Sequence, residues 1–171
     1  PFSADAWDWL ALPWFHACMG NHEDMLLSAE HDDDLFIWML NGGGWWMEQD
    51  ATTQTQLREA ITRLPLTMEV ETPYGSVGIV HADVPENMDW PTFKRALENN
   101  DPEARHCALW GRGRAEGFVR TAVGGIDRVV SGHTIMQDAQ THVVGNVWFI
   151  DTGAFHTGKL TVLDLDTLFE D

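Results

Sequence analysis

The pattern of hydrophobic and polar positions divides the chain into a mainly helical first part and a strand-rich last part. Helical spacing, together with residues that start or stop helices, predicts helices over 3–12, 23–30, 33–41, 52–64, 91–98 and 102–109. Short apolar runs predict strands over 14–19, 66–71, 77–81, 128–131, 141–144, 147–151 and 160–165. Because hairpin-connected strands follow helices, this order predicts a layered α/β fold with a mixed sheet.

Length and composition indicate one folded domain. The 171 residues are 44% hydrophobic and include 9 Trp and 8 Phe, which supply large apolar side chains for a core. No run is long and apolar enough for a membrane span, and the first residues lack the basic start of a signal peptide. Cys18 and Cys107 form no CxxC pattern, so we expect buried free thiols and a soluble, cytoplasmic protein.

The charge of the chain excludes two classes of partner. It carries 10 Lys+Arg against 27 Asp+Glu, a formal net charge of −17. Nucleic-acid backbones and anionic membranes would repel such a surface, so neither is expected as a partner. A phosphate-bearing substrate would need strong local positive charge, from a metal ion or a placed Arg.

Three histidines share a position relative to the predicted strands. His22 follows the strand 14–19, His81 ends the strand 77–81, and His133 follows the strand 128–131. If these strands are neighbours in a sheet, their imidazoles should meet at its carboxyl edge, where α/β proteins bind ligands. Neutral imidazole and the amide oxygen of Asn21 suit Mn, Fe or Zn. The alternative is that each histidine is an ordinary core or loop residue.

Several short motifs resemble a known family. The tetrapeptide Gly20-Asn21-His22-Glu23, followed by His81-Ala82-Asp83 and Gly132-His133-Thr134, resembles the later motifs of the calcineurin-like metallophosphoesterases. Four further stretches are similar to the bacterial and lambda-phage type serine/threonine protein phosphatases, namely 13–15, 40–45, 110–112 and 150–154. The resemblance extends over about residues 13–165 and implies a layered α/β/β/α sandwich with mixed sheets.

The resemblance also implies a site. Asn21, His81 and His133 match ligands of one of the family's two metal ions, for which Mn²⁺ is expected and Fe or Zn are alternatives. His22 matches the general acid, and Arg112 matches the arginine that binds phosphate oxygens beside Asn21 and His22. Two metal ions in such a site generate a hydroxide nucleophile and neutralise phosphoryl charge.

The implied activity is hydrolysis of a phosphorylated protein, or of a small phosphoester. Symmetrical diadenosine tetraphosphate hydrolases share these motifs, and the glycines between Asn41 and Trp46 favour the protein phosphatase. A relative without catalysis that binds phosphorylated partners is the other alternative. Asp151 is expected to support the site from the last sheet, and Asp83 could orient a histidine.

Two motifs of the family pattern do not occur in the sequence. GDxHG and GDxxDRG supply the ligands of the first metal ion and the bridging aspartate, and this chain contains no Gly-Asp dipeptide. We therefore expect residues 1–171 to be a single, N-terminally truncated phosphoesterase domain that lacks N-terminal strands. Alone, this chain should be nearly inactive.

Overall fold

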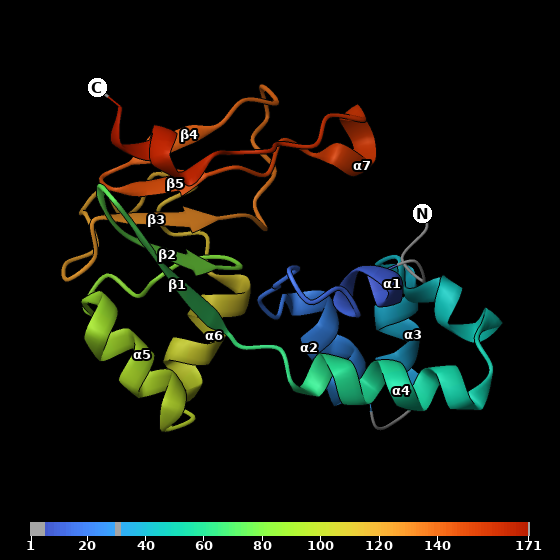
Figure 1. Ribbon diagram of the computed structural model, residues 1–171. Coiled ribbons are helices and arrows are strands. Elements are labelled where there is room, and N and C mark those ends of the chain that lie inside the picture. Colours follow the sequence, from blue (N-terminus) through green and yellow to red (C-terminus); the bar gives the residue numbers. More distant parts are fainter. Residues whose placement is uncertain (1–5, 30–31, 171) are drawn as a thin grey trace. The chain divides into compact units, whose positions relative to one another are not determined.

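The computed structural model describes residues 6–29 and 32–170 (Figure 1). Within them the chain packs as two compact units that divide between Pro65 and Leu66. The assignment of a single domain stays a prediction. None of the helices in the described ranges is long and apolar enough to cross a membrane.

The first unit is helical in its described residues, and its α-helices confirm those predicted from sequence, except that residues 3–5 and 30 of the predicted helices lie outside the described residues. Four α-helices and the short 3₁₀ helix η2 follow one another as α1 (Ala6–Leu10), α2 (Asn21–Ser28), α3 (Asp32–Leu40), η2 (Gly43–Glu48) and α4 (Ala51–Thr62). Asp50 starts α4 because its carboxylate accepts hydrogen bonds from the backbone N–H groups of Thr52 and Thr53. The apolar face of α4 buries Leu57 and Ile61.

Tryptophan side chains form the core at the turn between α3 and η2. The indoles of Trp38, Trp45 and Trp46 contact one another edge to face, with ring centroids 5.8–6.1 Å apart. A Cβ at Gly43 would come within 2.5 Å of the Trp38 ring, so only glycine allows this approach. The glycines therefore end a helix and admit close packing, and Trp46 is a core residue.

The strand predicted over 14–19 is wrong. Residues 15–20 belong to no helix or sheet, and the Met19 N–H donates a hydrogen bond to the carbonyl of Pro65. The Trp14 side chain is 65% exposed. A strand needs a neighbour for its backbone groups, and the described residues of this unit offer none. His22 consequently lies in the first turn of α2, not beyond a strand.

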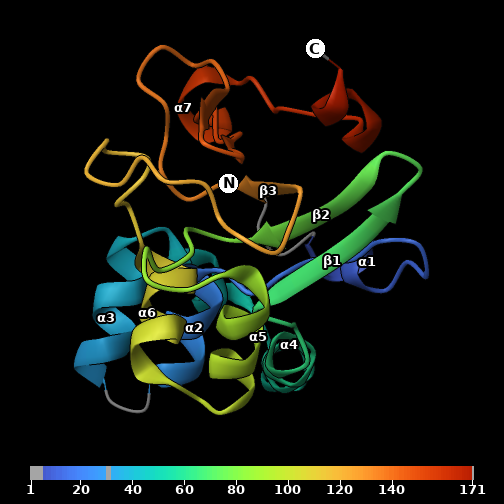
Figure 2. The same cartoon turned by 90° about the vertical axis from the view of Figure 1, so that its left-hand side faces the viewer.

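The second unit is built on a five-stranded mixed sheet, which confirms the α/β class (Figures 1 and 2). The strands are β1 (Thr67–Thr72), β2 (Gly75–Val80), β3 (Arg128–Ser131), β4 (His142–Val144) and β5 (Val147–Phe149). Their order in the sheet is β1-β2-β3-β5-β4. The central strands β2, β3 and β5 are parallel, whereas β1 and β4 pair with their neighbours as antiparallel hairpins.

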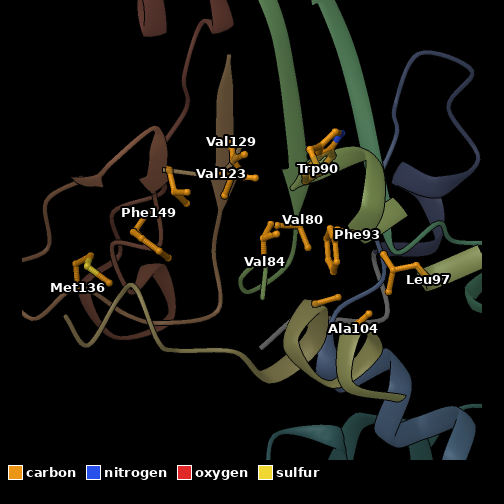
Figure 3. Packing of buried hydrophobic residues seen from close by; sticks show 12 residues of the cluster. Val80, Val84, Trp90, Phe93, Leu97, Ala104, Val123, Val129, Met136 and Phe149 are labelled. Carbon is orange, nitrogen blue, oxygen red and sulfur yellow. The ribbon is translucent and has the colours of Figure 1, made fainter. Parts of the chain in front are cut away.

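Two helices cover one face of this sheet. The helices α5 (Trp90–Glu98) and α6 (Pro102–Trp110) each begin with an Asp cap followed within two residues by Pro. Their side chains pack with those of β2, β3 and β5 in one apolar cluster (Figure 3). A Cβ at Gly78 would lie only 2.6 Å from the indole of Trp90. The absence of a side chain at Gly78 therefore lets α5 approach β2 closely.

The opposite face is covered by the C-terminal segment. Val77 and Val130 pack there with Leu168 of the 3₁₀ helix η3 (Leu165–Phe169). The strand predicted over 160–165 is wrong: the segment joins no ladder, and Leu160 and Val162 are exposed. A short helix, α7 (Ala154–Thr157), precedes it.

Candidate functional site

Two of the predicted histidines meet at the carboxyl edge of the sheet. His81 directly follows β2 and His133 follows β3, and these strands are parallel neighbours with Val80 opposite Ser131. The Gly132 N–H donates to the carbonyl of His81 over 2.9 Å, which continues the pairing past the strand ends. As a result, Nε2 of His81 and Nδ1 of His133 lie 3.2 Å apart. The sequence-based expectation of converging imidazoles holds for this pair.

The backbone of His133 is held in an unusual conformation. Its φ is +63°, in the left-handed region that few residues other than glycine adopt. The ring lies edge-on to the indole of Trp110, with centroids 5.9 Å apart. Such outliers persist only where the surrounding structure fixes them, and they cluster at functional sites.

Arg112 lies beside this pair. The helix α6 ends at Trp110, and Gly111 follows as its cap. A Cβ on Gly111 would lie only 2.6 Å from the carbonyl oxygen of Cys107 and would clash with it. The exposed guanidinium of Arg112 donates from Nη1 to the hydroxyl of Thr134 over 3.1 Å. Arg112 and His133 therefore come from different parts of the sequence to one place.

A pocket of about 760 Å³ opens at this place. Arg112, His133 and Thr134 line it together with Glu116 and the hydrogen-bonded pair of Asp138 and His142. The hydrogen bond from the His142 side chain, followed by one from the Gln140 backbone, holds the pKa of Asp138 below its ordinary value. The side chains that line the pocket thus include one guanidinium, two imidazoles and two carboxylates.

A buried ion pair, which no sequence pattern indicated, supports the same region. Nη1 of Arg114 lies 2.8 Å from Oδ1 of Asp83, and these side chains are 1% and 2% exposed. Asp83 was expected at most to orient a histidine, whereas its described partners are Arg114 and the backbone of Val84. A lone arginine in a loop carries no pattern that would have singled it out.

Asn21 and His22 belong to the first unit. Asn21 is buried and His22 exposed in the first turn of α2. Glu23 accepts a hydrogen bond from the Gly20 N–H over 2.9 Å, so it serves as a helix-capping acid. The roles predicted for Asn21 and His22 stay predictions.

The two imidazoles fit a divalent cation, although the described side chains include no group of three or more His, Cys, Asp or Glu that could hold one. Nitrogens that each lie about 2.1 Å from one ion, at tetrahedral or octahedral angles, are about 3.0–3.4 Å apart. The observed separation of His81 Nε2 and His133 Nδ1 is 3.2 Å. Two imidazoles leave other coordination positions for further ligands.

Asp151 lies just beyond β5 and joins neighbouring loops. Its carboxylate accepts from the Gly153 N–H, and its carbonyl accepts from the Met136 N–H, both over 2.9 Å. These bonds connect the end of β5 to the loop that carries His133. They fit the predicted supporting role.

Cys18 and Cys107 are free thiols, as expected, but they are half-buried and not fully buried. The thiol of Cys107 should nevertheless resist alkylation in the folded protein. Burial, and then the nearby charge of Asp83, raise its pKa to about 12, and burial likewise raises the pKa of Cys18. Because the folded chain holds these protons, stability should be unchanged below pH 9 and fall as the pH rises from there toward 12. We expect slow labelling by iodoacetamide at pH 8 and rapid labelling of both in urea, followed by mass spectrometry. Equal rates in both conditions would contradict this.

Comparison with known proteins gives several relatives. No family model matches the chain. Serine/threonine-protein phosphatase 2 of Salmonella typhimurium strain LT2 is 32% identical over 158 residues, which cover 89% of this chain and 68% of the relative. Serine/threonine-protein phosphatase 1 of the same organism is 32% identical, over 87% of this chain and 65% of its own. Serine/threonine-protein phosphatase 2 of Escherichia coli K12 is 28% identical over a match that covers 94% of this chain and 72% of the relative.

The matches agree with one another and with the motifs. The chain spans 65–72% of the length of these relatives, and each match extends over most of this chain. The chain belongs to the family of bacterial serine/threonine-protein phosphatases, of the metallophosphoesterase type.

Proposed function

We propose that this chain takes part in the metal-dependent hydrolysis of phosphoserine and phosphothreonine esters in proteins. The observation that carries the proposal is the 3.2 Å approach of the His81 and His133 imidazoles beside Arg112. The names of the relatives, all serine/threonine-protein phosphatases, support the substrate class.

The imidazoles would hold a divalent cation. His81 through Nε2 and His133 through Nδ1 are the proposed ligands, and the amide oxygen of Asn21 is added from the sequence motif. A cation in this site supplies Lewis acidity and positive charge for phosphoester hydrolysis. We propose Mn²⁺, with Fe or Zn as alternatives, because mixed nitrogen and oxygen ligands suit all of them. The resemblance adds a second ion, whose ligands it places in motifs that this sequence lacks.

Arg112 would bind the phosphoryl group. Its planar guanidinium can donate two parallel hydrogen bonds to phosphate oxygens. The positive charge matters here, because a chain of net charge −17 otherwise repels a phosphorylated substrate. His22 is proposed, on the sequence motif, to donate the proton that the leaving serine or threonine oxygen takes up.

With Mn²⁺, this chain should release phosphate from a phosphoserine peptide slowly, far below the rate of the Salmonella relative. By the resemblance, the motifs present in this sequence supply ligands for one cation only, so half of the metal charge expected in the family would be missing. Replacement of Arg112 by Met should lower even this rate about 100-fold, because a donor that stabilises developing charge is lost. A malachite-green phosphate assay measures both rates.

The control is Arg120→Met, which removes an exposed arginine from the same loop. Turnover equal to the relative's would contradict the expected loss of activity. Faster cleavage of diadenosine tetraphosphate than of the phosphopeptide would contradict the proposed substrate class. A rate independent of Mn²⁺ and of Arg112 would contradict the proposed site.

A further inference from the structure

The loops at the carboxyl edge of the sheet are joined by a closed series of side-chain contacts. His81 meets His133, and the next residue, Thr134, accepts a hydrogen bond from Arg112. Two residues beyond Arg112, Arg114 reaches back to Asp83, which lies two residues beyond His81. The ion pair of Asp83 and Arg114 thus closes the series between the imidazole pair and the guanidinium.

The ion pair fixes backbone as well as side chains. Oδ1 of Asp83 accepts from the Val84 N–H over 2.8 Å, and Oδ2 accepts from the Arg114 N–H over 3.0 Å. The guanidinium of Arg114 also donates to the carbonyls of Val84 and Thr121, the latter over 3.1 Å from Nε. One buried carboxylate and one buried guanidinium therefore tie the loop after β2 to two points of the loop that carries Arg112.

The loop after β2 is in turn fixed to α6. The Ala82 N–H donates to the Ala108 carbonyl over 2.9 Å, and the Asp83 N–H donates to the Cys107 carbonyl over 3.3 Å. At Gly111 a Cβ would lie 2.9 Å from Cβ of Asp83. These contacts join the end of α6, the loop after β2 and the ion pair on both sides of Arg112 in the sequence.

Stability alone does not account for this pair. A buried ion pair is often no more stabilising than apolar side chains of the same volume, so its presence calls for another role. The side chain of Arg112 is exposed, and the hydrogen bond that the structure describes for it is the one to Thr134. Its direction therefore depends on how firmly its backbone is held.

We propose that Asp83 and Arg114 are positioning residues that fix the Arg112 guanidinium at the pocket wall beside His133. The inference rests on the proposed function, in which Arg112 binds the phosphoryl group. Without the pair, Arg112 would sample several directions, and phosphate binding would weaken although the charge remains. Neither residue touches the substrate.

The test uses inorganic phosphate as the probe, without metal. It is titrated into the ¹⁵N-labelled chain, and the shift of the Thr134 backbone amide reports binding in every variant. The apolar double variant Asp83→Leu/Arg114→Met and the conservative variant Arg114→Lys should both fold, as thermal melts monitored by circular dichroism will show. Arg112→Met gives the phosphate affinity that remains when the proposed phosphate-binding side chain is removed. Arg120→Met is the charge-matched control.

We expect the double variant to bind phosphate about tenfold more weakly than the unaltered chain and almost as weakly as Arg112→Met. Lysine keeps the charge of Arg114 but lacks the planar guanidinium that donates to Asp83, Val84 and Thr121 together. The phosphate affinity of Arg114→Lys should therefore lie between those of the unaltered chain and the double variant. Arg120→Met should bind like the unaltered chain. A role in folding alone would lower the melting temperature without this order of affinities.

Two results would overturn the inference while leaving the proposed function intact. One is a folded double variant with unaltered phosphate affinity; if that variant fails to fold, a folded Arg114→Lys with unaltered affinity has the same meaning. The other is failure of both variants to fold, which would assign the pair to folding. Unaltered binding in Arg112→Met would instead remove Arg112 from the proposed site, and this inference with it.

Discussion

Replacing His81 and His133 together by Ala should abolish the binding of Mn²⁺ by this chain. Their nitrogens lie 3.2 Å apart, a separation that fits two ligands of one cation. Changes at groups that only support metal ligands already cost about 10–100-fold in affinity, so loss of two ligands should cost about 100-fold or more. Isothermal titration calorimetry measures the affinity, and each single Ala variant should weaken it in part.

The matched control for this prediction is His142→Ala. His142 lines the same pocket as His133 but pairs with Asp138. Its loss should leave Mn²⁺ affinity within about twofold, since it is no ligand of the proposed site. Equal losses in the control and the double variant would point to non-specific binding in an acidic pocket.

Arg114→Met by itself should destabilise the second unit by about 3–5 kcal/mol, because it leaves the Asp83 carboxylate buried without its ion partner. Urea unfolding monitored by tryptophan fluorescence measures this loss. The comparison is Lys94→Met, which breaks the pair of Lys94 and Glu69 near the surface. That pair is more than a third exposed on the lysine side, at 38%, so its loss should cost less than about 1 kcal/mol.

The double variant Asp83→Leu/Arg114→Met should regain most of this stability. With both charges gone, neither is left unpaired in the interior, and the effects of the two replacements are not additive. If the double variant were as unstable as the sum of two single variants, the pair would act through its separate backbone hydrogen bonds.

The meeting of His81 and His133 was predictable because each follows a short apolar strand with small neighbours. Neighbouring parallel strands have their carboxyl ends at the same edge of the sheet, so residues that follow such strands in the sequence lie close together in space. The helices α4, α5 and α6 were predictable for a similarly local reason, since each has an Asp cap ahead of its first turn.

The two incorrect strand predictions concern apolar segments that pair with no neighbouring strand. The stretches 14–19 and 160–165 have the composition of strands, but a strand also requires a neighbour that the local sequence does not specify. In the second of them, the Thr161 hydroxyl bonds to that of Thr152 and the apolar side chains of Leu163 and Leu165 pack against the sheet.

Arg114 was missed for a different reason. Arginine is normally exposed, and its burial depends on an aspartate 31 positions away in the sequence. The loop 111–121 that carries it has no periodic pattern. Long-range polar pairs of this kind are invisible to hydrophobic periodicity.

The positive φ of His133 limits how this centre could be redesigned with a different donor. A left-handed backbone is tolerated by asparagine and aspartate but strains β-branched residues, at a cost of about 1–3 kcal/mol. An oxygen donor introduced as His133→Asn or His133→Asp would therefore keep the loop's shape, whereas His133→Thr would distort it. Engineering toward harder, oxygen-preferring cations such as Mg²⁺ is thus open at this position through these two side chains.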